Sequence, residues 1–229
     1  LKATGLDRIA QIHPAMIAQD LDLHALERDG KVAAGLGLTM GEVACALSHR
    51  DVLVSFLGIS GPNYTHAVVF EDDAIVSAEV EQQLRAVGGG EGEGRDRSHD
   101  DTILRLLEIL AQTSESLGWQ GLNLGRCWDE CQFDQLVMKV PTDQVTAALH
   151  VTTTVVKSRK PLCTHAYIVT RGGAAARLAD TAPISDAEDR SRPGRPGFVY
   201  MATSPRVFDQ FARKDSIHQL APCPECFTR

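Results

Sequence analysis

Three adjacent carboxylates follow a short apolar run in the stretch "HAVVFEDDAIV". Glu71, Asp72 and Asp73 come directly after residues 67–70. Neighbouring carboxylates repel one another, and desolvating one of them is costly unless a cation or hydrogen-bond donors compensate. In an extended segment Glu71 and Asp73 would point to the same side, where such a pair can hold a hard divalent cation together with water and phosphate oxygens. Two interpretations therefore stay open, a solvated turn and a cation site.

The elements around this triplet are the clearest in the sequence. Thr39 and Glu42 have the spacing of a helical capping box, and apolar residues recur at helical spacing from there to Gly58, which predicts a helix. Residues 66–70 predict a short buried strand of the kind found inside parallel sheets. Ligands of open α/β sheets bind beyond the carboxyl ends of the strands, so the triplet would lie at the functional edge.

The remaining segments alternate between strand and helix patterns. Residues 74–87 indicate a helical segment and 102–117 an amphipathic helix. Further elements are strands at 121–125, 151–156, 166–170 and 198–201 and a short helix at 172–179. This alternation is typical of an α/β sandwich around a mostly parallel sheet, which we expect to form a single domain over residues 1–229. Residues 88–101 predict a disordered insertion loop and 189–197 a flexible loop.

Composition narrows the class of protein. The chain has 229 residues, 43% of them hydrophobic, and a net charge of −7, which is typical of a globular protein and argues against nucleic acid as a partner. No apolar run in the sequence reaches the 18 residues or so of a transmembrane helix. The chain begins with Leu1, so we expect an N-terminal piece to be missing, and targeting cannot be read.

Six cysteines leave the redox compartment open. Cys45 lies in a helical apolar pattern, which favours a buried, small hydrophobic residue. The pairs at 127 and 131 and at 223 and 226 could form two local disulfides, one cross-link or a structural zinc site. A zinc-stabilised interaction module is therefore one alternative function.

The order of these motifs resembles glycosyltransferase family 25, the family of lipooligosaccharide and procollagen galactosyltransferases. The family's Gly-Glu-x-x-Cys-x-x-Ser-His helix and Glu-Asp-Asp strand end are matched by Gly41, Glu42, Cys45, Ser48 and His49 and by Glu71, Asp72 and Asp73. Two later segments, "LGRCWDEC" and "THAYIVTRGGAAARLADTAPISDAED", are similar to further family blocks. Family members open with a strand that carries an Asn-Leu-x-Arg-type segment. Nothing before Leu36 matches it, so we expect that first strand to be missing.

This resemblance implies a GT-A-like three-layer sandwich and a metal-dependent hexosyltransferase. The donor would be UDP-galactose or UDP-glucose, the cofactor Mn²⁺ or Mg²⁺, and the acceptor a glycan, lipopolysaccharide or collagen-like hydroxyl. Asp73 and then Glu71 would bind the metal, and Asp72 would contact the sugar or ribose. Asp186 or Asp189, which follow Pro183, would be the base that takes the acceptor proton in an inverting reaction. The spacing favours Asp186 only narrowly.

Other candidate substrate contacts have a structural alternative. Ser48 and His49 fall inside the predicted helix, and His165 starts a predicted strand; histidines at such places are more often hydrogen-bonded core residues than ligands. A non-catalytic relative that binds carbohydrate or acts as a scaffold is the main alternative to the enzyme. Collagen-type acceptors would place the protein in the endoplasmic reticulum or Golgi lumen, which the Gly/Arg-rich insertions favour, and lipopolysaccharide in the bacterial cytoplasm.

Overall fold

The computed structural model describes Leu6 and residues 10–61, 63–87, 95–126, 131–140, 153–158, 163–188 and 196–211. The chain divides into two compact units. We call the first the sheet unit, which comprises Leu1–Gln11, Val68–Ile168 and Val199–Arg229. The second, the helical unit, comprises Ile12–Ala67 and Val169–Phe198.

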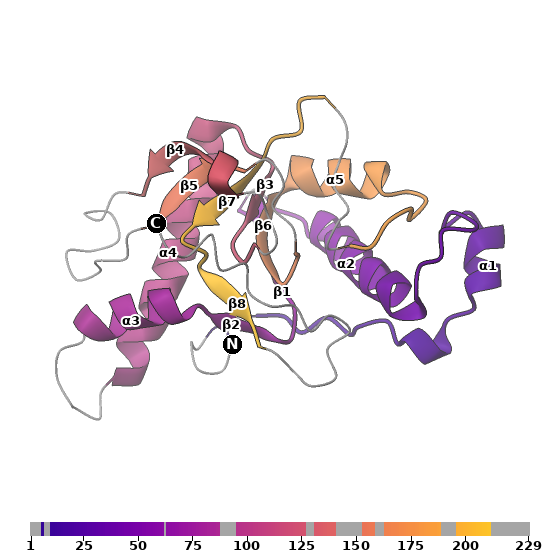
Figure 1. The fold of residues 1–229 in the computed structure, drawn as a ribbon, viewed down its shortest axis with the longest axis horizontal. Helices are drawn as coiled ribbons and strands as arrows, with labels where there is room; N and C mark the ends of the chain where they lie inside the picture. The colour runs from indigo at the N-terminus through magenta and orange to yellow at the C-terminus, as the bar shows by residue number, and fades with distance from the viewer. Residues whose placement is uncertain are drawn as a thin grey trace. The chain divides into compact units, whose positions relative to one another are not determined.

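Six strands form a mixed sheet in the order β1-β6-β3-β7-β5-β4 (Figure 1). Its strands are β1 (His66–Phe70), β3 (Gly121–Asn123), β4 (Gln135–Lys139), β5 (Thr154–Lys157), β6 (Ala166–Thr170) and β7 (Tyr200–Ser204). The sequence predicted β1 and β6 with these bounds. It predicted the other strands to within a few residues, except β4, which it missed.

The predicted strand direction is wrong for much of this sheet. β3 and β7 are parallel, but β5 is antiparallel to both β7 and β4. A short buried apolar run has the same pattern whichever way its neighbour runs, because direction is decided by the connections between strands. The architecture is therefore α/β with a mixed sheet rather than a mostly parallel one.

A second, two-stranded sheet lies directly after the acidic triplet. β2 (Ala74–Val76) is antiparallel to β8 (Phe208–Gln210), with Ala74 opposite Gln210 and Val76 opposite Phe208. The sequence predicted the start of a helix at Ala74. In the structure the helix α3 (Ala78–Val87) begins four residues later, after β2, because β8 supplies a strand partner that the local pattern does not reveal.

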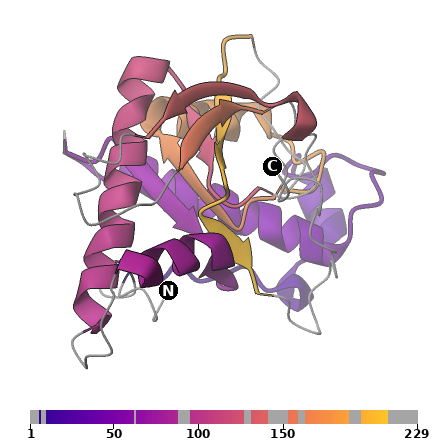
Figure 2. The same cartoon turned by 60° about the vertical axis from the view of Figure 1, so that its left-hand side comes forward.

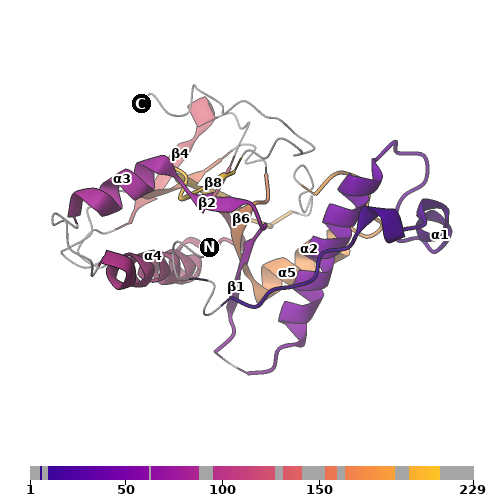
Figure 3. The same ribbon diagram turned by 90° about the horizontal axis from the view of Figure 1, so that it is seen from below.

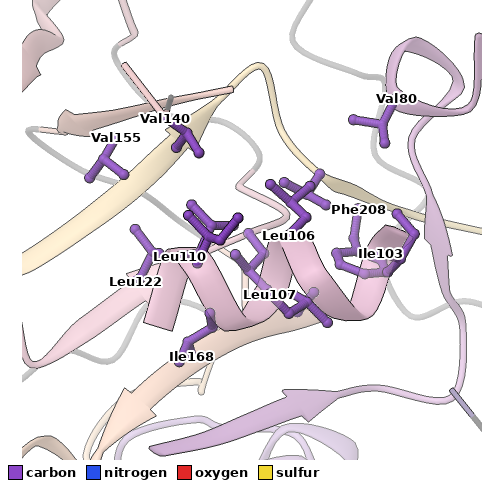
Figure 4. Packing of buried hydrophobic residues seen from close by; sticks show 14 of the residues in the cluster. Val80, Ile103, Leu106, Leu107, Leu110, Leu122, Val140, Val155, Ile168 and Phe208 are labelled. Atoms are coloured by element: carbon purple, nitrogen blue, oxygen red, sulfur yellow. The ribbon is translucent and has the colours of Figure 1, made fainter. Parts of the chain in front are cut away.

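The largest helix, α4 (Arg95–Leu117), covers the sheet unit's core. Figure 2 shows this helix beside the strands of the sheet. Its buried residues Ile103, Leu106 and Leu110 belong to one cluster with Leu122 of β3 and Ile168 of β6. In Figure 4, Ile103 lies next to Phe208 and Leu110 lies on the side of Leu122. Burying each such side chain contributes about 1.5–3 kcal/mol. The helix begins earlier than the predicted residue 102 and takes in 95–101, the second part of the predicted insertion loop.

The helical unit packs α2 (Met40–Gly58) beside α5 (Arg171–Asp180) (Figure 3). The predicted capping box is confirmed: Thr39 Oγ1 accepts from Glu42 N (3.2 Å), and Thr39 N donates to Glu42 Oε2 (2.8 Å). Arg50 joins the two helices by donating to Leu178 O at 3.0 Å and Thr181 O at 3.0 Å. A 3-10 turn, η3 (Ala18–Asp20), and a short helix, α1 (Leu23–Arg28), precede α2.

The described cysteines differ in state. Cys45 forms no disulfide and is only partly buried, whereas the sequence predicted a buried residue. Cys163 is disulfide-bonded, a pairing that the sequence analysis did not anticipate, and the side chains of the two cysteine pairs lie outside the described residues. Within the described parts of the chain, every helix is too short or too polar to cross a bilayer.

Candidate functional site

The acidic triplet forms the turn between β1 and β2. Glu71 N donates to His165 O (2.9 Å), which continues the pairing at the end of β1, and Ala74 N then donates to Glu71 O (3.1 Å). Asp72 and Asp73 occupy the turn itself. The expectation of an extended segment is therefore wrong, because the chain reverses here to start β2. The triplet nevertheless follows the carboxyl end of β1, as predicted.

The Glu71 carboxylate is held by a threonine from the segment that precedes β6. Thr164 Oγ1 donates to Glu71 Oε1 at 2.9 Å. Thr164 is buried and Glu71 is half-buried, whereas Asp72 is exposed. One Glu71 oxygen is therefore fixed by a neutral donor.

Asp73 has two carboxylate oxygens in different surroundings. Gln210 Nε2 donates to Asp73 Oδ2 at 2.9 Å, whereas Oδ1 is buried and has no hydrogen-bond partner among the described residues. Burial raises the pKa of Asp73 above its ordinary value, and the charges of Glu71 and Asp72 add to this, while the Gln210 hydrogen bond acts in the opposite direction. A bound cation would stabilise the ionised form of this carboxylate.

His165 lies beneath the acidic turn as a core residue. Its side chain is 2% exposed, and its Nε2 is 3.4 Å from Phe208 O. Burial lowers its pKa, against the opposing charges of Glu71, Asp73 and Asp209, so burial favours the neutral imidazole. Gly125 makes room for this ring, since a Cβ there would lie 2.1 Å from Nε2.

β8 contributes a further acidic residue that the sequence analysis missed. Asp209 is half-buried and forms an ion pair with Arg206. Burial raises the pKa of Asp209, while Arg206 and His165 lower it. Neither Asp209 nor Gln210 carries a local sequence signal, because the pairing of β2 with β8 joins segments 137 residues apart.

The other predicted site residues lie in the helical unit. Ser48 is engaged within that unit: its Oγ donates to Ala44 O (2.8 Å) and accepts from Met16 N (2.9 Å). His49 is buried in α2. The hydrogen bonds of Ser48 are those of a structural residue. A substrate contact of Ser48 or His49 stays a prediction.

The predicted bases follow α5. Asp186 is exposed, and its Oδ1 accepts from Ala187 N at 2.8 Å; Asp189 lies outside the described residues. Glu188, which the sequence analysis did not consider, is buried in an ion pair with Arg177 of α5. This pair anchors the segment that carries Asp186 to the helix.

Comparison with known proteins gives a family. No curated protein sequence gives a significant match to the chain. Residues 23–190, more than half of the chain, match the family described as Glycosyltransferase family 25 (LPS biosynthesis protein). This range includes α2, the acidic turn, Thr164, His165 and Asp186, and leaves out β7 and β8. The chain therefore belongs to glycosyltransferase family 25 and is a glycosyltransferase.

Proposed function

We propose that the acidic turn after β1 is the donor site of a metal-dependent hexosyltransferase that uses a UDP-sugar. Galactose or glucose would be transferred to a glycan hydroxyl, and the family description favours a lipopolysaccharide-type acceptor over a protein hydroxyl. The observation that carries the proposal is the buried Oδ1 of Asp73, which has no hydrogen-bond partner among the described residues. A buried carboxylate oxygen without a donor is costly, and a bound cation removes that cost.

The donor set of the acidic turn fits a hard divalent cation. Its side chains offer carboxylate oxygens, the ligands that Mg²⁺ and Mn²⁺ prefer. Glu71 and Asp73 each have one oxygen held by a neutral donor, Thr164 Oγ1 and Gln210 Nε2. A neutral donor orients a carboxylate without bringing a positive charge next to it. Asp73 is therefore the first ligand that we propose and Glu71 the second.

Each residue of the turn then has a distinct task. Asp73 and Glu71 would hold the ion, and exposed Asp72 would accept hydrogen bonds from hydroxyls of the ribose or sugar. When bound, the ion neutralises the charge that develops on the diphosphate leaving group. His165, kept neutral by burial, supports the turn through its backbone oxygen, which accepts from Glu71 N, and adds no competing positive charge.

A carboxylate must also take the acceptor proton if the reaction inverts the sugar's configuration. We propose Asp186 for this role, with Asp189 as the alternative. Asp186 is exposed, and its Oδ1 accepts from Ala187 N, which orients the carboxylate at the surface. The buried pair of Arg177 and Glu188 holds this segment in place.

A donor screen tests the proposed activity. We expect the protein to release UDP from UDP-galactose or UDP-glucose when Mn²⁺ and a lipopolysaccharide core oligosaccharide are present, because metal and acceptor must both be bound for transfer. Asp73→Asn should abolish release, and Glu79→Gln, which removes an exposed carboxylate of α3, should not. The measurement is coupled detection of UDP together with mass analysis of the acceptor. Binding of the oligosaccharide without UDP release for any donor would instead indicate a non-catalytic carbohydrate-binding relative.

A further inference from the structure

Residues at the end of β8 hold Asp73 at two points, its main-chain oxygen and its carboxylate. Phe211 N donates to Asp73 O at 2.8 Å, and Gln210 Nε2 donates to Asp73 Oδ2 at 2.9 Å. The pairing of Ala74 with Gln210 places the two segments in this register. The main chain and the side chain of Asp73 are therefore both held by residues at the end of β8.

The hydrogen bond from Gln210 gives the two carboxylate oxygens of Asp73 different roles. Oδ2 has its donor, so rotation of the carboxylate about its last bond would break that hydrogen bond. Oδ1 is buried and has no partner among the described residues. The orientation set by Gln210 therefore decides which oxygen stays available and where it points.

We propose that Gln210 is a positioning residue that presents Asp73 Oδ1 to the divalent cation of the donor site, an inference that rests on the proposed function. The residue lies outside the range 23–190 that matches the family, so the family match assigns it no role. It acts on the ion only through Asp73. Residues that orient the ligands of a metal site commonly govern affinity in this way.

The chemical type of Gln210 suits this task. Its amide is a neutral donor, so it fixes a carboxylate without bringing positive charge next to a cation. A lysine or arginine at the same place would neutralise Asp73 and repel the ion. The other charged groups that act on Asp73 are Glu71 and Asp72, which favour a cation, and His165, whose neutral form burial favours.

Manganese titration of the metal-free protein tests the inference without any assay of activity. The electron paramagnetic resonance signal of free Mn²⁺ falls as the ion binds and gives the dissociation constant. We expect Gln210→Met, which keeps the length of the side chain and loses the donor, to weaken Mn²⁺ binding by about 10–100-fold, the usual range for loss of a residue that orients a metal ligand. Gln210→Asn, whose amide is too short to reach Oδ2, should behave alike.

A matched substitution controls for the general effect of replacing an exposed glutamine in a strand. Gln135 of β4 is also exposed, and Gln135→Met should leave the Mn²⁺ affinity unchanged. The spectrum of bound Mn²⁺ should also change in Gln210→Met, since a reoriented carboxylate alters the symmetry around the ion. Loss of fold alone would not give this spectral change. Thermal unfolding without metal shows whether each variant is folded.

The outcomes separate this inference from the proposed function. Wild-type protein that binds Mn²⁺ and folded Gln210 variants that bind it equally well, with the same spectrum, would overturn the positioning role and leave the donor site standing. Folded wild-type protein that does not bind Mn²⁺, alone or with UDP, would overturn the proposed function itself. Weaker binding in both Gln210 variants with unchanged Gln135→Met supports the inference.

Discussion

Asp73 lowers the stability of the folded protein at neutral pH and is the first metal ligand of the proposed donor site. Its carboxylate is half-buried beside two other acidic residues, and burial and their charges raise its pKa. A group with a raised pKa in the folded state binds a proton more tightly there than in the unfolded chain. Its contribution to stability is therefore fully present at pH values below its ordinary value of 3.8 and is lost as the pH rises through the folded-state pKa.

Replacing this carboxylate should stabilise the metal-free protein at neutral pH. Asp73→Asn removes the charge, and its side-chain oxygen can still accept from Gln210. We expect the unfolding temperature at pH 7 to rise by about 2–4 °C for a gain of roughly 1 kcal/mol, and the gain to shrink as the pH falls toward 3.8. Scanning calorimetry in the presence of a chelator measures this effect.

The control for this variant is Glu79→Gln, which also removes one negative charge, at an exposed position in the first turn of α3. It should give no gain, because that carboxylate is solvated and favours the start of the helix. A decrease of stability in Asp73→Asn at pH 7 that fades as the pH falls would show that the ionised Asp73 stabilises the fold rather than strains it.

At the scale of elements, one buried ion pair fixes the segment that follows α5. Arg177 and Glu188 are each about 4% exposed, and their pairing holds residues 182–188 against the helix. Removing one partner of such a pair leaves the other charge buried and unpaired. We expect Glu188→Ala to lower the free energy of unfolding by about 3–5 kcal/mol, as measured by denaturant titration.

Two further variants give this prediction its controls. Arg177→Met with Glu188→Leu should recover most of the loss, since apolar residues of similar volume replace both charges. Glu108→Ala breaks the exposed pair of Arg105 and Glu108 in α4 and should cost less than about 1 kcal/mol. A Glu188→Ala variant as stable as the wild type would mean that this pair does not anchor the segment.

Local signals account for what the sequence could predict at this scale. The capping box at Thr39 and the apolar runs of β1 and β6 are contained in short stretches, so α2 and these strands were predicted with accurate starts. The predicted start of α4 was too late because residues 95–101 are polar and the apolar helical pattern begins only at Ile103. β2 was mistaken for helix because three residues are too few to show a strand pattern.

The residues of the candidate site also divide into those with a local sequence signal and those without one. Glu71, Asp72 and Asp73 were found because they are adjacent and follow an apolar run. Gln210 could not be found, since it reaches Asp73 only through the pairing of β2 and β8 across 137 residues. Side-chain partners also escaped prediction: the sequence did not reveal that Ser48 bonds to Ala44 and Met16. Its contact with substrate stays a prediction.

At the scale of the whole molecule, charge bears on how the donor could bind. The chain carries a net charge of −7, and three of its carboxylates lie together on the turn of the candidate donor site. A UDP-sugar is itself anionic, so its diphosphate and this turn repel one another unless a cation lies between them. We therefore expect no measurable binding of the UDP-sugar without the metal. The family match alone would also allow a metal-independent site.

The measurement that tests this claim most directly is calorimetric titration of UDP into the metal-free protein, with and without Mn²⁺. Wild-type protein and Glu79→Gln should bind UDP only when Mn²⁺ is present, and Asp73→Asn should not bind it in either condition, because that variant lacks the first ligand of the ion. Binding of UDP by Asp73→Asn with wild-type affinity, or by the wild type equally well without metal, would contradict a cation-dependent donor site at the end of β1.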